Sequence, residues 1–140
     1  MKVNVYYMPS REQNQLRIGK ARAAFSKLRH LWCRHAVSLS VKGRVYSAAV
    51  RPIILLYGSE TWPLRADDVR KLSVFDHRCL RSIARVWWEH RISNAEVRLM
   101  VFGQQEAHGI NKLISLHRLR WLGHVLRMSP ERLPRRALFA

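Results

Sequence analysis

The stretch Ala66 to Val86, ADDVRKLSVFDHRCLRSIARV, decides the fold class of this chain. Its apolar side chains recur every three or four residues, as on one face of an amphipathic helix. They are Val69, Leu72, Phe75, Cys79, Leu80, Ile83 and Val86. Asp67 and Asp68 lie in the first turn, where the helix dipole favours negative charge. The stretch therefore predicts a helix over residues 66–86 with its apolar stripe facing a core.

The N-terminal side predicts a second long helix. Residues 1–9 show no helical pattern and are expected to be irregular. Ser10 is a candidate N-cap, with Gln13 three residues later as its capping-box partner. Apolar residues then follow at helical spacing from Leu16 to Trp32, among many good helix formers. This helix is expected to be decorated with arginines and lysines.

A third helix is predicted between these two. Ser40 is its candidate N-cap, and Pro52 should end or kink it because proline cannot donate the helical hydrogen bond. The apolar run from Ile53 to Tyr57 is too short for periodicity to decide between helix and buried strand. Both possibilities therefore stay open for this run.

Two helices are predicted after residue 90. The sequence from Ser93 to Glu96 is a capping box that starts a short helix, and Gly103 ends it. A last long helix is expected from about Glu106 to Met128, before the prolines of the tail. Its apolar face carries Ile110, Leu113, Ile114, His117, Trp121 and Val125.

Together these signals predict an all-α fold of four to five helices in a small bundle. One helical domain is expected over residues 10–128, after an irregular N-terminus at 1–9 and before a tail at 129–140. The expected core consists of Val69, Leu72, Phe75, Leu80, Ile83, Leu113, Trp121 and Val125. Trp87 is also expected to lie in the core, since it follows the stripe of the 66–86 helix.

The charge of the chain favours a polyanionic partner. Its 140 residues include 26 Lys and Arg against 9 Asp and Glu, giving a net charge of +17. Nucleic acid (RNA, DNA or a hybrid) is the expected partner, since a one-sided charge of this size is its electrostatic counterpart. No secretory signal and no apolar run long enough to span a membrane are visible, so an intracellular, nuclear protein is expected.

Arginines flank the predicted helices, and tryptophans lie beside some of them. Arginine binds phosphate bidentately, and bases stack on aromatic rings. Trp88 lies off the apolar stripe and is the preferred stacking candidate. The candidate nucleic-acid contacts are Arg78, Arg81, Arg85, Trp88, Arg118, Arg120 and Arg127. A solvated basic face is the alternative interpretation of these arginines.

The sequence predicts no catalytic residue, metal ion, cofactor or small-molecule substrate. Asp67 and Asp68 mimic the paired aspartates of a polymerase, but they open an amphipathic helix and stand among positive charges. His30, Cys33 and His35 cluster without the spacing of a zinc site. Two cysteines do not make a disulfide framework.

Several blocks of the chain carry a family resemblance. They are Arg17–Phe25, Lys42–Tyr46, LLYGSETW at 55–62, Val74–Arg81, RISNAEVR at 91–98, LRWLGHVLRM at 119–128 and Arg132–Pro134. In this order they resemble the C-terminal part of the reverse transcriptases of non-LTR retrotransposons, of the RTE/BovB-like endonuclease–reverse transcriptase type. The likeness covers roughly residues 17–140, and the first 16 residues do not match.

The resemblance implies a thumb and post-thumb segment that contacts the template–primer duplex. In that family the polymerase aspartates and the endonuclease lie upstream of the matched region, so no catalytic residue is carried over. A truncated, non-functional relic of such an element is one alternative. An unrelated basic helical protein that meets an acidic protein or a membrane surface is another.

Overall fold

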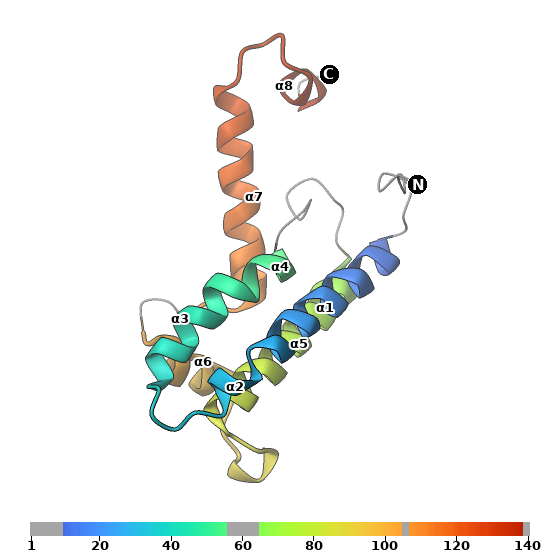
Figure 1. Ribbon diagram of the computed structural model, residues 1–140. Helices are drawn as coiled ribbons and strands as arrows, with labels where there is room; N and C mark the ends of the chain where they lie inside the picture. Colours follow the sequence, from blue (N-terminus) through green and yellow to red (C-terminus); the bar gives the residue numbers. More distant parts are fainter. Residues whose placement is uncertain (1–9, 56–64, 105–106, 139–140) are drawn as a thin grey trace.

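The computed structural model describes residues 10–55, 65–104 and 107–138 (Figure 1). Every regular element in these ranges is helical, which confirms the predicted all-α fold. In chain order the elements are α1 (Ser10–Lys27), α2 (Arg29–Trp32), α3 (Leu39–Ala49), α4 (Arg51–Leu55), α5 (Ala66–Ala84), the 3-10 turn η2 (Trp88–His90), α6 (Asn94–Phe102), α7 (Ile110–Arg127) and α8 (Leu133–Leu138). The predicted irregular segment 1–9 lies outside the described residues.

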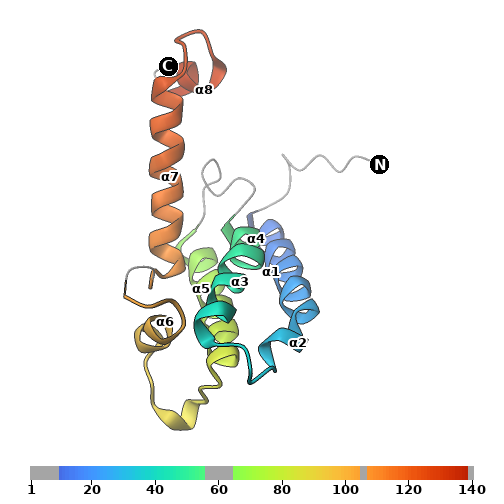
Figure 2. The same ribbon diagram turned by 60° about the vertical axis from the view of Figure 1, so that its left-hand side comes forward.

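Helix α5 is the centre of the bundle. It packs against α1, α3, α6 and the start of α7, while α7 then rises away from the other helices towards α8 (Figures 1 and 2). The predicted stripe is buried or packed on the core along its whole length, from Val69 to Val86. The helix ends at Ala84, two residues early, because Arg85 adopts the left-handed conformation with a φ of 54°.

The paired aspartates lie in the first turn of α5, as predicted. Asp68 is buried, and its carboxylate accepts a hydrogen bond from the Arg65 backbone N–H at 3.3 Å. Asp67 lies on the surface and forms ion pairs with Arg70 at 2.7 Å and Lys71 at 3.2 Å. These two cations lower the pKa of the Asp67 carboxyl group, mainly through their hydrogen bonds to it.

The helix predicted from Ser10 divides into two, which accounts in part for the larger number of helices. The backbone tightens at Leu28, whose N–H bonds to the Phe25 carbonyl. That carbonyl also accepts a hydrogen bond from the Trp32 indole at 2.9 Å, and the rings of Phe25 and Trp32 stack with centroids 5.3 Å apart. The Trp32 indole therefore donates to the Phe25 carbonyl, which in a continuous helix would accept its hydrogen bond from the backbone.

Helix α3 begins earlier than predicted and ends as predicted. The prediction of Ser40 as N-cap was wrong: Ser38 has the extended backbone of a cap, and its hydroxyl accepts from the Val41 N–H. Leu39 packs against the core, so the helix has to include it. The helix stops at Ala49, and Pro52 lies in the first turn of α4, where its missing N–H costs nothing.

Most of the predicted core is confirmed, but its two most C-terminal members, Trp121 and Val125, lie outside the main core. Leu72, Leu80 and Ile83 are almost completely buried. The prediction for Trp121 was wrong, since it is only half-buried and lies outside the main core. Only the first turns of α7 pack on the bundle. Val125 is fully buried, but it lies towards the end of the helix that meets α8 rather than in that core.

A buried ion pair lies between the helices. The Asp76 carboxylate on α5 is completely buried and accepts hydrogen bonds from the Tyr46 hydroxyl at 2.7 Å and from Arg51 at 3.0 and 3.2 Å. Arg51 also donates to the His108 carbonyl at 2.9 Å, and its guanidinium lies 4.3 Å from the centre of the Phe102 ring. This Arg51–Asp76 network connects α3, α4 and α5 to the segment that enters α7.

Candidate nucleic-acid interface

The three candidate arginines of α5 have different environments. Arg78 is exposed on the helix. Arg81 is half-buried and donates to the Asn94 side chain at 3.0 Å and to the Ile92 carbonyl, so it holds the start of α6. Arg85 lies beyond the helix end and donates to the Cys33 carbonyl at 3.0 Å. The three therefore do not form one uniform basic face.

The two tryptophans after α5 are both exposed. The prediction that Trp87 lies in the core was wrong, because 59% of its surface is accessible. The left-handed turn at Arg85 ends the helix and directs the following chain off the stripe. Trp88, the predicted stacking candidate, is 84% exposed and begins η2.

The arginines of α7 lie on two sides of that helix. At 3.6 residues per turn, Arg120 and Arg127 fall within about 20° of each other around the axis, and Lys112 lies about 60–80° from them. Arg118 points to a different side, roughly 160° from Arg120. All four are exposed, and the 18 residues of α7 include no acidic side chain. We call Lys112, Arg120 and Arg127 the α7 basic stripe.

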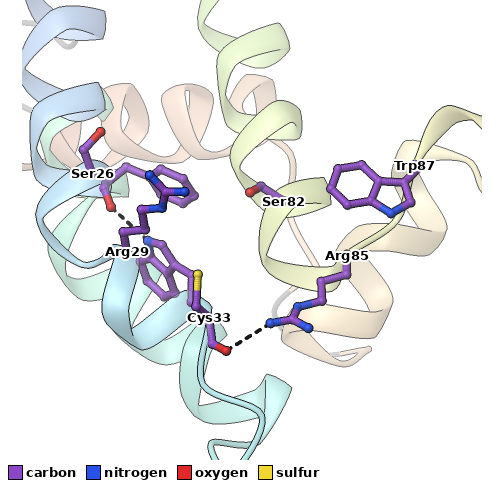
Figure 3. Close-up of a pocket in the computed structure, with 8 residues that line it drawn as sticks. Ser26, Arg29, Cys33, Ser82, Arg85 and Trp87 are labelled. Atoms are coloured by element: carbon purple, nitrogen blue, oxygen red, sulfur yellow. Dashed lines mark hydrogen bonds between the residues drawn. The ribbon is translucent and has the colours of Figure 1, made fainter.

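An open groove of about 440 Å³ lies between the α1–α2 corner and the end of α5. Its lining consists of Phe25, Ser26, Arg29, Trp32, Cys33, Ser82, Arg85 and Trp87, without an acidic residue. Figure 3 shows Arg29 and Cys33 on one side, with Arg85 and Trp87 on the other. This groove as a whole was not predicted, although its Arg85 is one of the candidate contacts and its Trp87 directly precedes the candidate Trp88.

Reactive chemistry has little support among the described residues. No three His, Cys, Asp or Glu side chains gather there in a way that could hold a metal ion. Cys79 is buried, and burial raises the pKa of its thiol to about 12, so it stays protonated. His77 lies half-buried, with its Nε2 atom 2.7 Å from the Arg98 guanidinium.

In the part of the chain that the structure describes, no helix is both long and apolar enough to cross a membrane. No protein-family model matches the chain, and neither the curated proteins nor the solved structures gave a match.

Proposed function

We propose that this chain is a non-catalytic nucleic-acid-binding module that contacts the sugar–phosphate backbone. The observation that carries the proposal is the α7 basic stripe, on a helix that lacks acidic residues and rises away from the bundle after its first turns (Figures 1 and 2). A nucleic-acid backbone can approach such a helix without meeting a repelling charge. The net charge of +17 supplies the long-range attraction.

The contacts are expected to be electrostatic and nearly blind to sequence. Arg120 and Arg127 can each hold a phosphate through two parallel hydrogen bonds, and Lys112 adds a point charge. Phosphate contacts set position and affinity but carry no base information. We therefore expect similar affinities for RNA, DNA and hybrid duplexes of the same length.

The proposed origin is the C-terminal region of a non-LTR retrotransposon reverse transcriptase. It is supported by the quoted sequence blocks, of which LRWLGHVLRM at 119–128 covers the whole C-terminal half of α7. Such a module would act inside the cell, in the nucleus. We expect no polymerase activity from it. The Asp68 carboxylate accepts a hydrogen bond from the Arg65 backbone N–H at the start of α5, and Asp67 forms ion pairs with Arg70 and Lys71 on the surface. A primed template should remain unextended with magnesium and nucleotides.

Salt-dependent binding tests the proposal. Each phosphate contact contributes about 0.9 to the log–log slope of affinity against salt on duplex DNA. The variant K112Q/R120Q/R127Q should flatten that slope by roughly 0.9 for each contact it removes. The control K20Q/R22Q/R44Q removes the same charge from exposed positions on α1 and α3 and should change the slope much less.

Two results would contradict the proposal. If both variants flatten the slope equally, α7 makes no specific contact and the stripe is a solvated face. If the unmodified protein binds no nucleic acid even at low salt but binds an acidic protein or anionic vesicles, it belongs to the alternative class of basic interaction proteins.

A further inference from the structure

We propose that the groove between the α1–α2 corner and the end of α5 binds one unpaired nucleotide of a single strand, with its base on Trp87 and its phosphate between Arg29 and Arg85. This inference rests on the proposed function for the class of ligand. It adds a second site, distinct from the α7 basic stripe, and a preference for unpaired strands.

The aromatic composition of the groove fits a base. Trp32 forms part of the lining, is only 4% exposed and stacks on Phe25. Trp87 lines the other side and leaves 59% of its surface accessible, so a ring face is available for stacking. Stacking on a tryptophan face tolerates any base, since each base has a π face.

The charge of the groove fits a phosphate. Arg29 and Arg85 lie on opposite sides (Figure 3), and no carboxylate lines the space between them. Arg85 is held by its hydrogen bond to the Cys33 carbonyl, which lies on the opposite side of the groove (Figure 3). The Nη1 atom of Arg85 also lies 3.0 Å from the His35 ring nitrogen Nε2. Since a guanidinium has five N–H donors, these two contacts still leave Arg85 capacity to donate. The hydroxyls of Ser26 and Ser82 add neutral hydrogen-bonding groups.

The size of the groove favours one nucleotide. Its volume of about 440 Å³ lies within the range of roughly 300–1,000 Å³ typical of small-ligand sites. A base inside a duplex keeps both faces stacked on its neighbours and cannot present one to Trp87. A base in a single strand can be turned out and stacked on an aromatic side chain. The occupant is therefore an unpaired nucleotide rather than a duplex.

Neighbouring tryptophans provide a matched test. Affinities for a fluorescent single-stranded oligonucleotide and for a duplex of the same length would be measured by anisotropy. W87A should weaken single-strand binding by about fivefold or more, the lower end of what stacking on one ring contributes. W88A replaces an exposed tryptophan outside the groove and should change it less than twofold. Duplex binding should be unchanged in both variants.

An abasic oligonucleotide with the same number of phosphates separates stacking from charge. The unmodified protein and W87A should bind it equally, because it has no base to stack. R29Q should weaken binding of both the normal and the abasic strand, since it removes a phosphate contact. Trp87 and Arg29 are exposed, so both variants should keep the far-UV circular dichroism spectrum of the unmodified protein.

Cys33 reports directly on the groove. It lines the groove and is exposed, whereas Cys79 is buried. A bound single strand should therefore slow alkylation of Cys33 by iodoacetamide, and a duplex should not. If the duplex protects Cys33 equally, or if W88A rather than W87A weakens single-strand binding, the groove assignment is wrong while the proposed function stands. If neither nucleic acid binds, both proposals fail.

Discussion

Replacing Asp76 with asparagine should remove a large part of the folding free energy. The substitution keeps the size of the side chain and its ability to accept from the Tyr46 hydroxyl. It removes the negative charge that faces Arg51, whose side chain is only 6% exposed. The guanidinium would then remain buried without a counter-ion.

The structure sets the order of magnitude of this loss. Removing one partner of a buried ion pair costs about 3–5 kcal/mol. Y46F removes one hydrogen bond to a charged acceptor and should cost about 1.5–3 kcal/mol. R70Q removes a surface pair whose arginine is 74% exposed, and it should leave the stability nearly unchanged. Because a small domain is stable by about 5–15 kcal/mol, D76N is expected to stand close to the folding threshold.

Urea unfolding followed by circular dichroism would measure the three variants. The expected order of destabilisation is D76N, then Y46F, then R70Q. If D76N does not fold at all, Y46F still tests the network at a measurable loss. A D76N protein as stable as R70Q would refute the reasoning, because the Asp76 charge would then not compensate Arg51.

Three other variants or probes give independent outcomes. Native protein should react with a thiol reagent at Cys33 alone, because Cys79 is buried and burial raises the pKa of its thiol to about 12. Unfolding should make the Cys79 thiol reactive as well. Two reactive thiols in the native protein would contradict this. Burial, together with the charge of Arg98, lowers the pKa of His77 below 6.5. Below that pH the unfolded chain binds the proton more readily than the folded protein does. The free energy of unfolding should therefore fall as the pH drops below 6.5. H77Q should reduce this acid-dependent loss, and identical acid titrations would argue against it. G43A should lower the melting temperature strongly, because its Cβ would lie 2.6 Å from the Val101 carbonyl oxygen, whereas G19A on open surface should raise it slightly; equal effects would show that α3 and α6 do not approach so closely.

Local signals explain the parts of the fold that could be predicted. The stripe of α5 repeats over about five turns, so no single residue decides which face of the helix is apolar. The capping box before α6 is complete within four residues: Ser93 accepts from the Glu96 N–H at 3.2 Å, and Glu96 accepts from the Ser93 N–H at 2.9 Å. Gly103 ends the helix, as predicted. Each of these features depends only on neighbours in the sequence.

The errors come from features that neighbours do not determine. Arg85 has a positive φ that is normally favourable for glycine, so nothing in the sequence marks the end of α5 there. Continuing the stripe past this point put Trp87 in the core. Trp121 has the correct helical phase, but α7 leaves the bundle before reaching it. The periodicity of a helix predicts which face is apolar, but it does not predict where the helix leaves the bundle.

The groove was beyond sequence reasoning for a related reason. Arg85 and Cys33 are 52 positions apart and meet only because the chain breaks at Leu28 and folds α2 back. In a continuous helix Arg29 would have been one more solvated cation. The site therefore depends on a helix interruption that the good helix formers around Leu28 do not signal.

The Arg51–Asp76 network also bears on the order of folding. Its hydrogen bonds join residues 25, 30 and 57 positions apart, so none can form within a single helix. Bringing such distant groups together costs loop-closure entropy, which the surrounding apolar contacts must offset first. The network should therefore form late, after α3 and α5 have met. A compact chain with α4 misplaced would bury the Asp76 carboxylate alone, and the resulting energy gap disfavours that misfolded state.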